Sequence, residues 1–391
     1  MGLGAMAVPV GLARGLAGRS PVGEEATRYH RIQLVLGMVG LALSVLYLVG
    51  WLLSGAGPAL VDLAGRISGA RWWLVGVVAV TLGVGQGLLT FVLTWVRGYW
   101  LPRRYGLLHQ TLRGWLADRL KAAVLGGALA LGAVEVIYGL IEATPLWWLL
   151  AAGFFLVVQV ALAVIFPVWL LPLFYRLTPL VDAQLRERLL ALAERAGVRA
   201  IGVWVADQSR KSRTANAAVA GLGRTRRIIL FDTLVNEFPP DEMTSVLAHE
   251  LAHHVHRDTW RALGVQAVLT IVALWAVDRL LEVGGTAWGL AGHADPAGVP
   301  WLALVVLTLG LLTTPLANGF SRWIERQADD FALAVTGDAR AFVAAMERLA
   351  ALNLAERRPH PVKELLLHSH PSIDRRIARA MAARLSVPSR S

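Results

Sequence analysis

The chain has 391 residues, of which 56% are hydrophobic and only 17% are charged, with a mean hydropathy of +0.54. A soluble domain carries about a quarter charged residues, so this composition favours an integral membrane protein. The lack of cysteine excludes disulfides, thiolate metal sites and cysteine nucleophiles. The net charge of +11 would suit nucleic acid, but the arginines flank apolar runs, so we interpret them as topology charges and expect no nucleic-acid partner.

Six apolar runs have about the 20 residues that a helix needs to cross a bilayer. They are Ile32–Leu53, Trp72–Val96, Ala122–Ile141, Leu146–Phe174, Ala262–Leu281 and Val299–Leu316. The fourth contains Pro167 and Pro172, where we expect a kink or a broken end. Asp278 and Arg279 close the fifth and are expected at the membrane interface. Residues 1–31 begin rich in Gly and Ala without a signal-peptide core, and we expect a flexible N-terminal tail.

These runs predict a membrane domain of four spans over 32–175, a cytosolic catalytic segment over 176–261, two further spans over 262–318, and a second cytosolic segment over 319–391. Of the 38 Lys and Arg residues, 34 lie in four segments: 1–31, 98–121, 176–261 and 319–391. With six spans, all four segments fall on one side of the bilayer, and the positive-inside rule makes that side cytoplasmic. We therefore expect a protein of the inner, or cytoplasmic, membrane.

The hydrophilic segments contain patterns of helices and short strands. The predicted elements are helices over 180–196, from 239–242 to about His256, over 339–354 and over 373–385, and strands over 201–205 and 227–231. Asp241 or a neighbour is the expected N-cap of the second helix.

His249-Glu250-Leu251-Ala252-His253 is an H-E-x-x-H pattern. Residues four apart share one face of a helix, so both imidazoles can hold one metal ion. Glu250 can then take a proton from a water at the metal, as in zinc peptidases. The alternative is a surface helix that happens to carry two histidines. His254 and His256 do not share that face with a partner, and we expect them on the surface.

A third metal ligand is predicted downstream, where the sixth apolar run ends. Glu325 and Asp329 are four residues apart and share a helix face. Glu325 would complete a His, His, Glu site for one Zn²⁺ per chain, with a position left open for water. Asp329 would hold a ligand imidazole through its free N–H. A solvated charged helix is the alternative. His370 lies in a short turn before a helix, from which its side chain can reach into a cleft.

These motifs, in this order and spacing, resemble the type-one CAAX prenyl endopeptidases, which are integral-membrane zinc metallopeptidases related to the membrane heat-shock proteases. The resemblance covers about residues 100–385. It rests on His249–His253 with Arg257-Asp258; Asn318, Ser321-Arg322, Glu325 and Ala328-Asp329; Ser369-His370-Pro371; Asn216-Ala217-Ala218 and Arg227–Leu234; and Gly106, Gln110-Thr111, Trp115, Asp118 and Lys121.

The resemblance implies the following roles: His249, His253 and Glu325 as zinc ligands, Glu250 as general base, Asp329 as the acid that orients a ligand histidine, Arg322 as an arginine near the metal helix, Asn216 as a contact to the substrate backbone, and His370 as support for the tetrahedral intermediate. It also implies an all-α membrane protein: a polytopic bundle of six to seven transmembrane helices around a water-filled chamber, with a mostly helical cytosolic zinc-peptidase domain. The expected partners are the lipid bilayer and a peptide or protein substrate, prenylated or not. Eukaryotic members are longer and have seven spans, whereas six are found here.

Other functions remain open on the sequence alone. An intramembrane zinc protease also uses H-E-x-x-H, but within an apolar span, whereas Asp241 and Asp258 flank the motif here. A quality-control protease of broad specificity is not separated from a CAAX protease. A metal-binding, transport or scaffold protein of the membrane is the non-enzyme alternative. It is disfavoured because Glu250 is intact and the spans hold almost no ionisable residue beyond Glu135.

Overall fold

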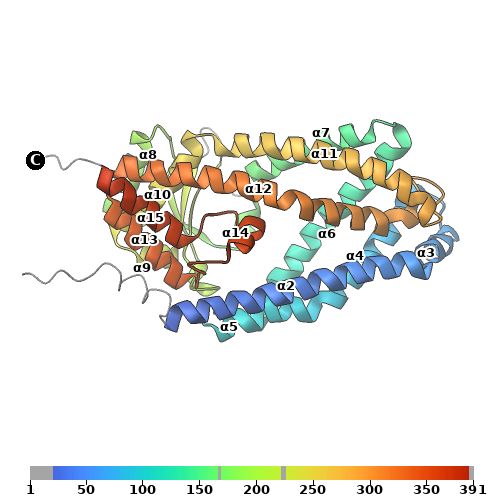
Figure 1. Ribbon diagram of the computed structural model, residues 1–391, viewed down its shortest axis with the longest axis horizontal. Coiled ribbons are helices and arrows are strands. Elements are labelled where there is room, and N and C mark those ends of the chain that lie inside the picture. Colours follow the sequence, from blue (N-terminus) through green and yellow to red (C-terminus); the bar gives the residue numbers. More distant parts are fainter. Residues whose placement is uncertain (1–20, 166–168, 222–225, 387–391) are drawn as a thin grey trace, which may run out of the picture.

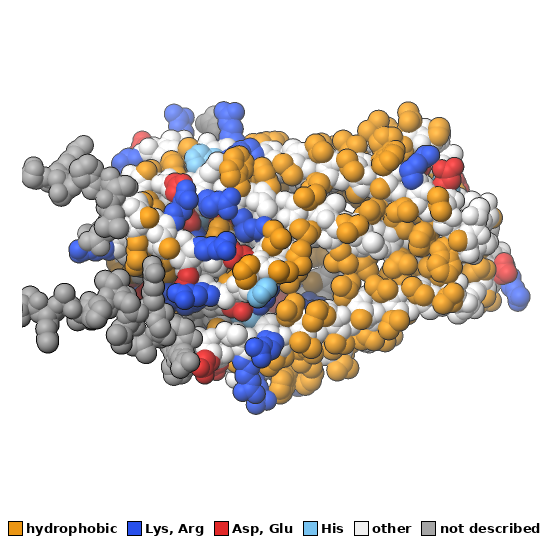
Figure 2. Space-filling model, viewed as in Figure 1, with side chains coloured by type: hydrophobic (Ala, Val, Ile, Leu, Met, Phe, Trp, Pro, Cys, Tyr) orange, Lys and Arg blue, Asp and Glu red, His pale blue; other side chains and the backbone are white. Residues whose placement is uncertain are grey.

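The computed structural model describes residues 21–165, 169–221 and 226–386. Long helices run along the longest axis of the molecule, and shorter helices and a sheet gather at one end (Figure 1). Apolar side chains cover the long helices, whereas most charged side chains lie over the other end (Figure 2). This division matches the expected bundle of membrane helices with a hydrophilic domain attached.

Five helices of the described chain are long and apolar enough to cross a membrane: α2 (Pro21–Ser54), α4 (Arg71–Trp95), α6 (Leu112–Ala143), α11 (Asp258–Ala287) and α12 (Val299–Thr336). The fourth predicted span corresponds to a shorter apolar helix, α7 (Trp147–Ile165). The expected kink at Pro167 lies outside the described residues, and Pro172 lies in a 3-10 turn, Leu171–Leu173. The described residues therefore hold five helices of this length and one shorter apolar helix, where six to seven spans were expected.

Two expectations about the membrane helices were wrong. Residues 21–31, expected in the tail, form the first turns of α2; residues 1–20 lie outside the described part. Asp278 does not close its helix at an interface, because α11 continues to Ala287. The Asp278 side chain is buried and accepts a 2.6 Å hydrogen bond from Nε1 of Trp147 on α7. Packing of α7 against α11 thus provides this carboxylate with a partner.

The membrane helices pack through a shared apolar core. Its largest fully buried side chains are Trp147 and Tyr138, which pack with valines of α4 and α11. Other aliphatic side chains, such as Leu88 and Val157, are more than half exposed, as expected where lipid rather than protein covers a helix. A cavity of about 1030 Å³ lies among α2, α4, α6 and α12. Small and aliphatic side chains line nearly all of it, so it suits hydrocarbon better than the water that the resemblance implied.

The hydrophilic end is built around a four-stranded sheet in the order β1-β2-β4-β3, where only β2 and β4 are parallel. The strands are β1 (Leu177–Pro179), β2 (Val203–Ala206), β3 (Ala217–Ala220) and β4 (Arg227–Phe231). The alanine-rich β3 and the short β1 were not expected, since neither has the β-branched alternation of a strand. β3 ends the sheet, so one of its edges is unpaired within the described chain.

Helices cover this sheet and share its apolar core, which includes Leu189, Ile228, Leu247 and Phe342. They are α8 (Ala183–Arg195), α9 (Asp232–Glu237), α10 (Pro240–Val255), α13 (Ala339–Leu352) and α15 (Ile373–Ser386). The short helix α14 (Pro361–Leu367) packs against α12 instead. The remaining smaller elements are α3 (Ala56–Gly65), a π-helical turn (Val96–Trp100), α5 (Leu101–Arg104) and 3-10 turns at Gln208–Arg210 and Pro296–Gly298.

Helix α12 joins the two halves of the molecule. Its 38 residues extend about 57 Å at 1.5 Å per residue, and Pro315 lies inside it without ending it. The predicted sixth span and the predicted helix with Glu325 are therefore one continuous element (Figure 1). The helix ends at Gly337, whose φ of 65° is in the left-handed region that glycine adopts readily. Glu325 is thus carried by the same helix that forms the sixth predicted span.

Candidate metal centre

Helix α10 places the H-E-x-x-H residues in the interior of the hydrophilic domain. Pro240 occupies its first turn, a position where the missing N–H costs nothing. Asp241 does not cap the helix as expected: the N-cap is Pro239, with no side-chain hydrogen bond. Glu242 is buried and instead pairs with Arg348 of α13 through bonds of 2.8 and 3.2 Å. Packing against α12 and α13 then buries most of the helix, His249 included.

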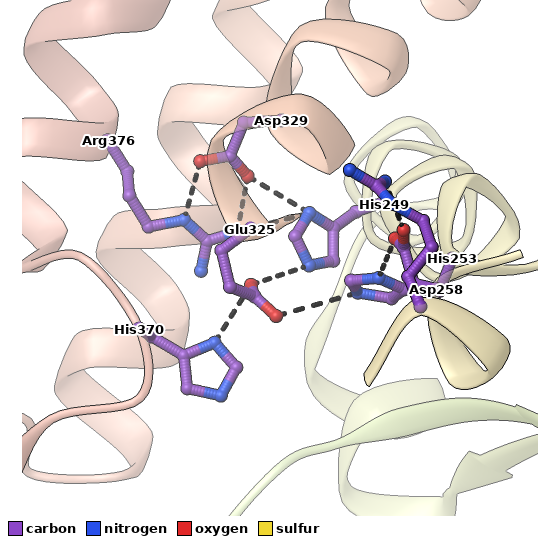
Figure 3. Close-up of polar contacts among 8 residues, drawn as sticks. His249, His253, Asp258, Glu325, Asp329, His370 and Arg376 are labelled. Atoms are coloured by element: carbon purple, nitrogen blue, oxygen red, sulfur yellow. Dashed lines mark hydrogen bonds and ion pairs between the residues drawn. The ribbon is translucent and has the colours of Figure 1, made fainter. Parts of the chain in front are cut away.

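Three side chains converge between α10 and α12. The ligand atoms of His249, His253 and Glu325 all lie within 4.8 Å of one another. Nε2 of His249 is 3.2 Å from Oε2 of Glu325, and Nε2 of His253 is 3.6 Å from Oε1 (Figure 3). Two imidazoles and one carboxylate directed at one small volume are a typical donor set for a divalent metal ion. The structure therefore brings together the three residues that the sequence predicts as ligands.

The other ring nitrogen of each histidine has a carboxylate partner. Nδ1 of His249 lies 2.9 Å from Oδ1 of Asp329, and Nδ1 of His253 lies 3.0 Å from Oδ2 of Asp258. These contacts fix the Nδ1–H tautomer and leave Nε2 of each ring free to bind a metal. The placement of Asp329 agrees with its expected role. Asp258 was quoted only as part of a motif, and it reaches His253 because the chain turns sharply between α10 and α11.

Arg376 is a member of this site that the sequence did not predict. Its guanidinium donates bonds of 2.6 and 2.9 Å to the two oxygens of Asp329, and Nη2 lies 3.3 Å from Nδ1 of His249. The residue lies on α15, 47 positions after Asp329, with the side chain largely buried. One more arginine in an amphipathic helix carries no local signal of this contact, and only the packing of α15 against α12 creates it.

Burial and these contacts shift the acidity of the site. Burial alone lowers the pKa of His249, but its hydrogen bonds with Asp329 and Glu325 outweigh burial and raise that pKa to about 9. Burial raises the pKa of Glu250, and the two neighbouring histidines only partly oppose this effect. A carboxylate with a raised pKa is a better proton acceptor at neutral pH than an ordinary glutamate.

His370 and Arg322 belong to one substructure. The His370 side chain is exposed on the loop between α14 and α15, and its Nδ1 lies 2.8 Å from Oε2 of Glu325. Arg322 is buried on α12 and donates to the backbone oxygens of Glu364 and His368, at 2.9 and 2.5 Å. Arg322 therefore holds the segment that carries His370.

Asn216 directly precedes β3 and is exposed at the edge of the sheet. Its Oδ1 accepts a 2.9 Å hydrogen bond from the Ala217 N–H. His254, expected on the surface, is half-buried and donates from Nε2 to the Val219 oxygen at 2.8 Å, so it ties α10 to this strand. His256 is also half-buried, edge-on to the Phe331 ring. The expectation for these two histidines was wrong because neighbouring elements cover that side of α10.

Two known protein families together match nearly the whole length of this chain. Residues 179–384 match the family described as Peptidase family M48. This chain belongs to peptidase family M48. Residues 22–176 match the description "CAAX prenyl protease N-terminal, five membrane helices". The M48 match spans strands β2 to β4, the H-E-x-x-H helix and the segment from Glu325 to Arg376.

Individual relatives of this M48 chain come from bacteria and eukaryotes. It is 30% identical to the uncharacterized metalloprotease YhfN of Bacillus subtilis over 313 residues, which are 78% of this chain and 72% of that protein. It is 34% identical to CAAX prenyl protease 1 of Saccharomyces cerevisiae over 203 residues, 49% of this chain and 44% of that protein. The crystal structure of S. mikatae Ste24p superposes with a TM-score of 0.80 at 22% identity, covering 92% of this chain and 89% of that one, and so shares its fold.

Membership of M48 makes the protein an integral-membrane metallopeptidase that acts on peptide or protein substrates. It disfavours an intramembrane zinc protease. That class carries its motif within a span, whereas α10 of this M48 chain lies in the hydrophilic domain.

Proposed function

We propose that this metallopeptidase is a zinc-dependent endopeptidase whose site faces the cytosol. The convergence of His249, His253 and Glu325, with both Nδ1 atoms held by carboxylates, supports the proposal. Two imidazoles and one carboxylate suit zinc, whereas magnesium and calcium prefer oxygen donors alone. The Lys and Arg excess in the hydrophilic segments supports the cytosolic orientation in a cytoplasmic membrane.

The residues around the centre then have distinct tasks. Zinc, when bound, supplies a water that is acidic enough to attack at neutral pH and polarises the scissile carbonyl. Glu250 accepts the proton of the attacking water and returns it to the leaving amine, a task that its raised pKa favours. His370, whose Nδ1 lies 2.8 Å from Oε2 of Glu325, donates a hydrogen bond in this proposal to the oxygen on which negative charge develops. Asp329 and Asp258 keep the ligand imidazoles in the required tautomer.

The substrate backbone lies along the outer edge of β3 in this proposal, where His254 already occupies the Val219 oxygen. An extended peptide can add to an unpaired strand through main-chain hydrogen bonds. Asn216 stands at the start of that edge with its Oδ1 already bound to Ala217, which leaves its amide group directed to other partners. Small side chains in β3 permit close approach of a peptide, and α10 packs beside the same strand.

The apolar cavity among the membrane helices supports a prenylated substrate. Its lining extends from Phe91 and Leu120, near the hydrophilic ends of α4 and α6, to Val299 at the far end of α12. A volume of about 1030 Å³ with an aliphatic lining would hold an isoprenyl chain, whose transfer from water is favourable. We therefore propose cleavage next to a prenylated cysteine, the activity for which the CAAX prenyl proteases among its relatives are named.

The test uses purified protein in detergent and three substrates: a farnesylated CAAX peptide, its unfarnesylated counterpart and an unfolded fragment of a membrane protein. Glu250→Gln protein is the blank. Cleavage confined to the farnesylated peptide would establish the proposed specificity. Equal cleavage of both peptides, or of the fragment, would replace it with broad quality-control proteolysis. No metal-dependent cleavage of any substrate would refute the proposed function.

A further inference from the structure

A second cavity adjoins the metal centre on the side of His253 and has a volume of about 370 Å³. Its lining consists of Arg226, His253, His254, Arg257, Thr259 and Trp260. Two arginines face this space and no acidic residue of the described chain lines it, so it is suited to an anion. None of the contacts described above for the metal centre uses either arginine.

Arg226 is a partly buried cation without an acidic partner in the described chain. It directly precedes β4, and its Nε is buried and has no hydrogen-bond partner among the described residues. Arg226 lines the cavity together with His254, so its charge lies beside this space. A buried donor without a partner is costly, and an anionic ligand would remove that cost.

Arg257 occupies a backbone position that disfavours arginine. Its φ of 56° and ψ of 39° are in the left-handed region, which glycine and asparagine adopt more easily. Its side chain is exposed and forms no ion pair with a described residue. The turn needs only the backbone of this residue, so the conformation does not explain an arginine here. We therefore attribute the arginine at this position to its side chain, which faces the cavity. Residues with strained backbones often cluster at ligand sites.

The cavity lies where a peptide on β3 would continue. His254 lines the cavity and also donates to the oxygen of Val219 in β3. A peptide that leaves the metal centre along the strand edge therefore passes His254 on its way to the arginines. A carboxylate of that peptide would reach them within a few residues of the scissile bond.

We propose that Arg226 and Arg257 form a carboxylate subsite of the peptidase. The ligand is a peptide carboxylate, either an acidic side chain or the C-terminal carboxylate. This inference rests on the proposed function, because it requires a peptide at the metal centre. An anionic lipid is disfavoured as the ligand because His253, a proposed metal ligand, lines the same cavity.

The test measures binding in the Glu250→Gln background, in nanodiscs of neutral phosphatidylcholine. Fluorescent peptides form two matched pairs: a free C-terminal acid against its amide, and aspartate against asparagine near the scissile bond. In one of the two pairs, the Glu250→Gln parent protein is expected to bind the acidic peptide about tenfold more tightly than its neutral counterpart. This ratio corresponds to the free energy of one charged hydrogen bond. Arg257→Gly and Arg226→Gln should each remove most of this preference, and the pair affected identifies the source of the carboxylate. Arg195→Gln on α8, which removes one exposed charge elsewhere, should leave it unchanged.

Stability separates the subsite from a structural role. Arg257→Gly suits the left-handed backbone, so its melting temperature should equal or exceed that of the parent while the preference is lost. The proposal is overturned if the parent shows no acidic preference, if both arginine variants retain it, or if Arg195→Gln removes it equally. It is also overturned if anionic phosphatidylglycerol discs abolish the preference, since the cations then serve lipid. Cleavage of the amide peptide is measured separately, with protein in which Glu250 is intact. A failure of the proposed function would appear in this cleavage assay, whereas a failure of the subsite would appear in the ratio of acidic to neutral peptide binding.

Discussion

Oδ1 of Asp329 lies 2.9 Å from Nδ1 of His249, and the same carboxylate accepts two hydrogen bonds from Arg376. Three helices, α10, α12 and α15, thus meet in one chain of buried polar contacts (Figure 3). Each side chain in this series is the hydrogen-bond partner of another. A substitution at any one of them therefore leaves a buried polar group without its hydrogen bond. The metal centre and the packing of the C-terminal helix therefore depend on each other.

Replacing Asp329 should affect both properties. Asp329→Asn should weaken zinc binding by about 10- to 100-fold, the usual effect of losing such a carboxylate partner. It should also destabilise the domain by about 3–5 kcal/mol, because Arg376 stays buried without an opposite charge. Competition with a chelating dye and denaturant unfolding measure the two effects. The double variant Asp329→Asn with Arg376→Met should regain stability but not zinc affinity; unchanged zinc affinity in the single variant would contradict this role.

Asp258 should be the weaker of the two carboxylate partners. Asp258→Asn should reduce zinc affinity through His253, by about tenfold. The loss of stability should be smaller than for Asp329→Asn, because the other partner of Asp258 is Arg261, which is partly exposed and also bonded to Gln327. The same dye competition and unfolding experiments give the comparison. A stability loss as large as that of Asp329→Asn would show that the turn, and not the imidazole, depends on Asp258.

Glu250 should be needed for hydrolysis and not for metal binding. Glu250→Gln should keep the fold and stoichiometric zinc while kcat falls by about 10²- to 10⁴-fold, as expected for loss of a general base. Zinc content by metal analysis and turnover of a fluorogenic peptide are the measurements. Glu187→Gln, an exposed glutamate of α8, is the matched control and should retain activity. Wild-type turnover by Glu250→Gln protein would refute the mechanism.

The stability of the metal-free protein should fall as the pH rises, whereas its affinity for zinc should increase. The pKa of His249 rises from an ordinary 6.5 to about 9 in the folded, metal-free protein. The stability that this histidine provides is therefore fully present below pH 6.5 and is lost as the pH rises through about 9. Zinc must displace the same proton, so apparent zinc affinity should increase about tenfold per pH unit between 7 and 9. Thermal unfolding of chelator-treated protein and zinc titrations check both; a flat zinc affinity over this range would contradict the prediction.

Arg322 should influence catalysis through the segment that carries His370. Arg322→Lys shortens the side chain that donates to the backbone oxygens of Glu364 and His368, so kcat should fall about tenfold for the loss of one charged hydrogen bond. KM and zinc affinity should change little, because the metal ligands stay in place. Steady-state kinetics of the Arg322→Lys variant are the measurement. The control is Arg326→Lys, which changes an exposed arginine on the same helix. A drop in zinc affinity equal to the drop in kcat would instead assign Arg322 to the metal centre.

The membrane helices and the candidate ligand set could be predicted from the sequence because both depend on local patterns. Apolar runs of bilayer length predict spans whatever surrounds them, and five of the six correspond to long apolar helices. The four-residue spacings of His249 with His253 and of Glu325 with Asp329 place each pair on one helix face. Such spacing needs no knowledge of the fold, only that each segment is helical.

Tertiary structure decided how these local elements meet. The roles of Arg376 and Arg322 depend on contacts between segments that are far apart in sequence, and the role of Asp258 depends on a sharp turn. No periodicity in the sequence indicates such contacts. His254 faces β3 for the same reason, although its sequence neighbours suggest a surface position. Local hydrogen-bond and hydrophobic patterns fix what a segment becomes, whereas the partner of a buried charge is set by the packing that removes it from water.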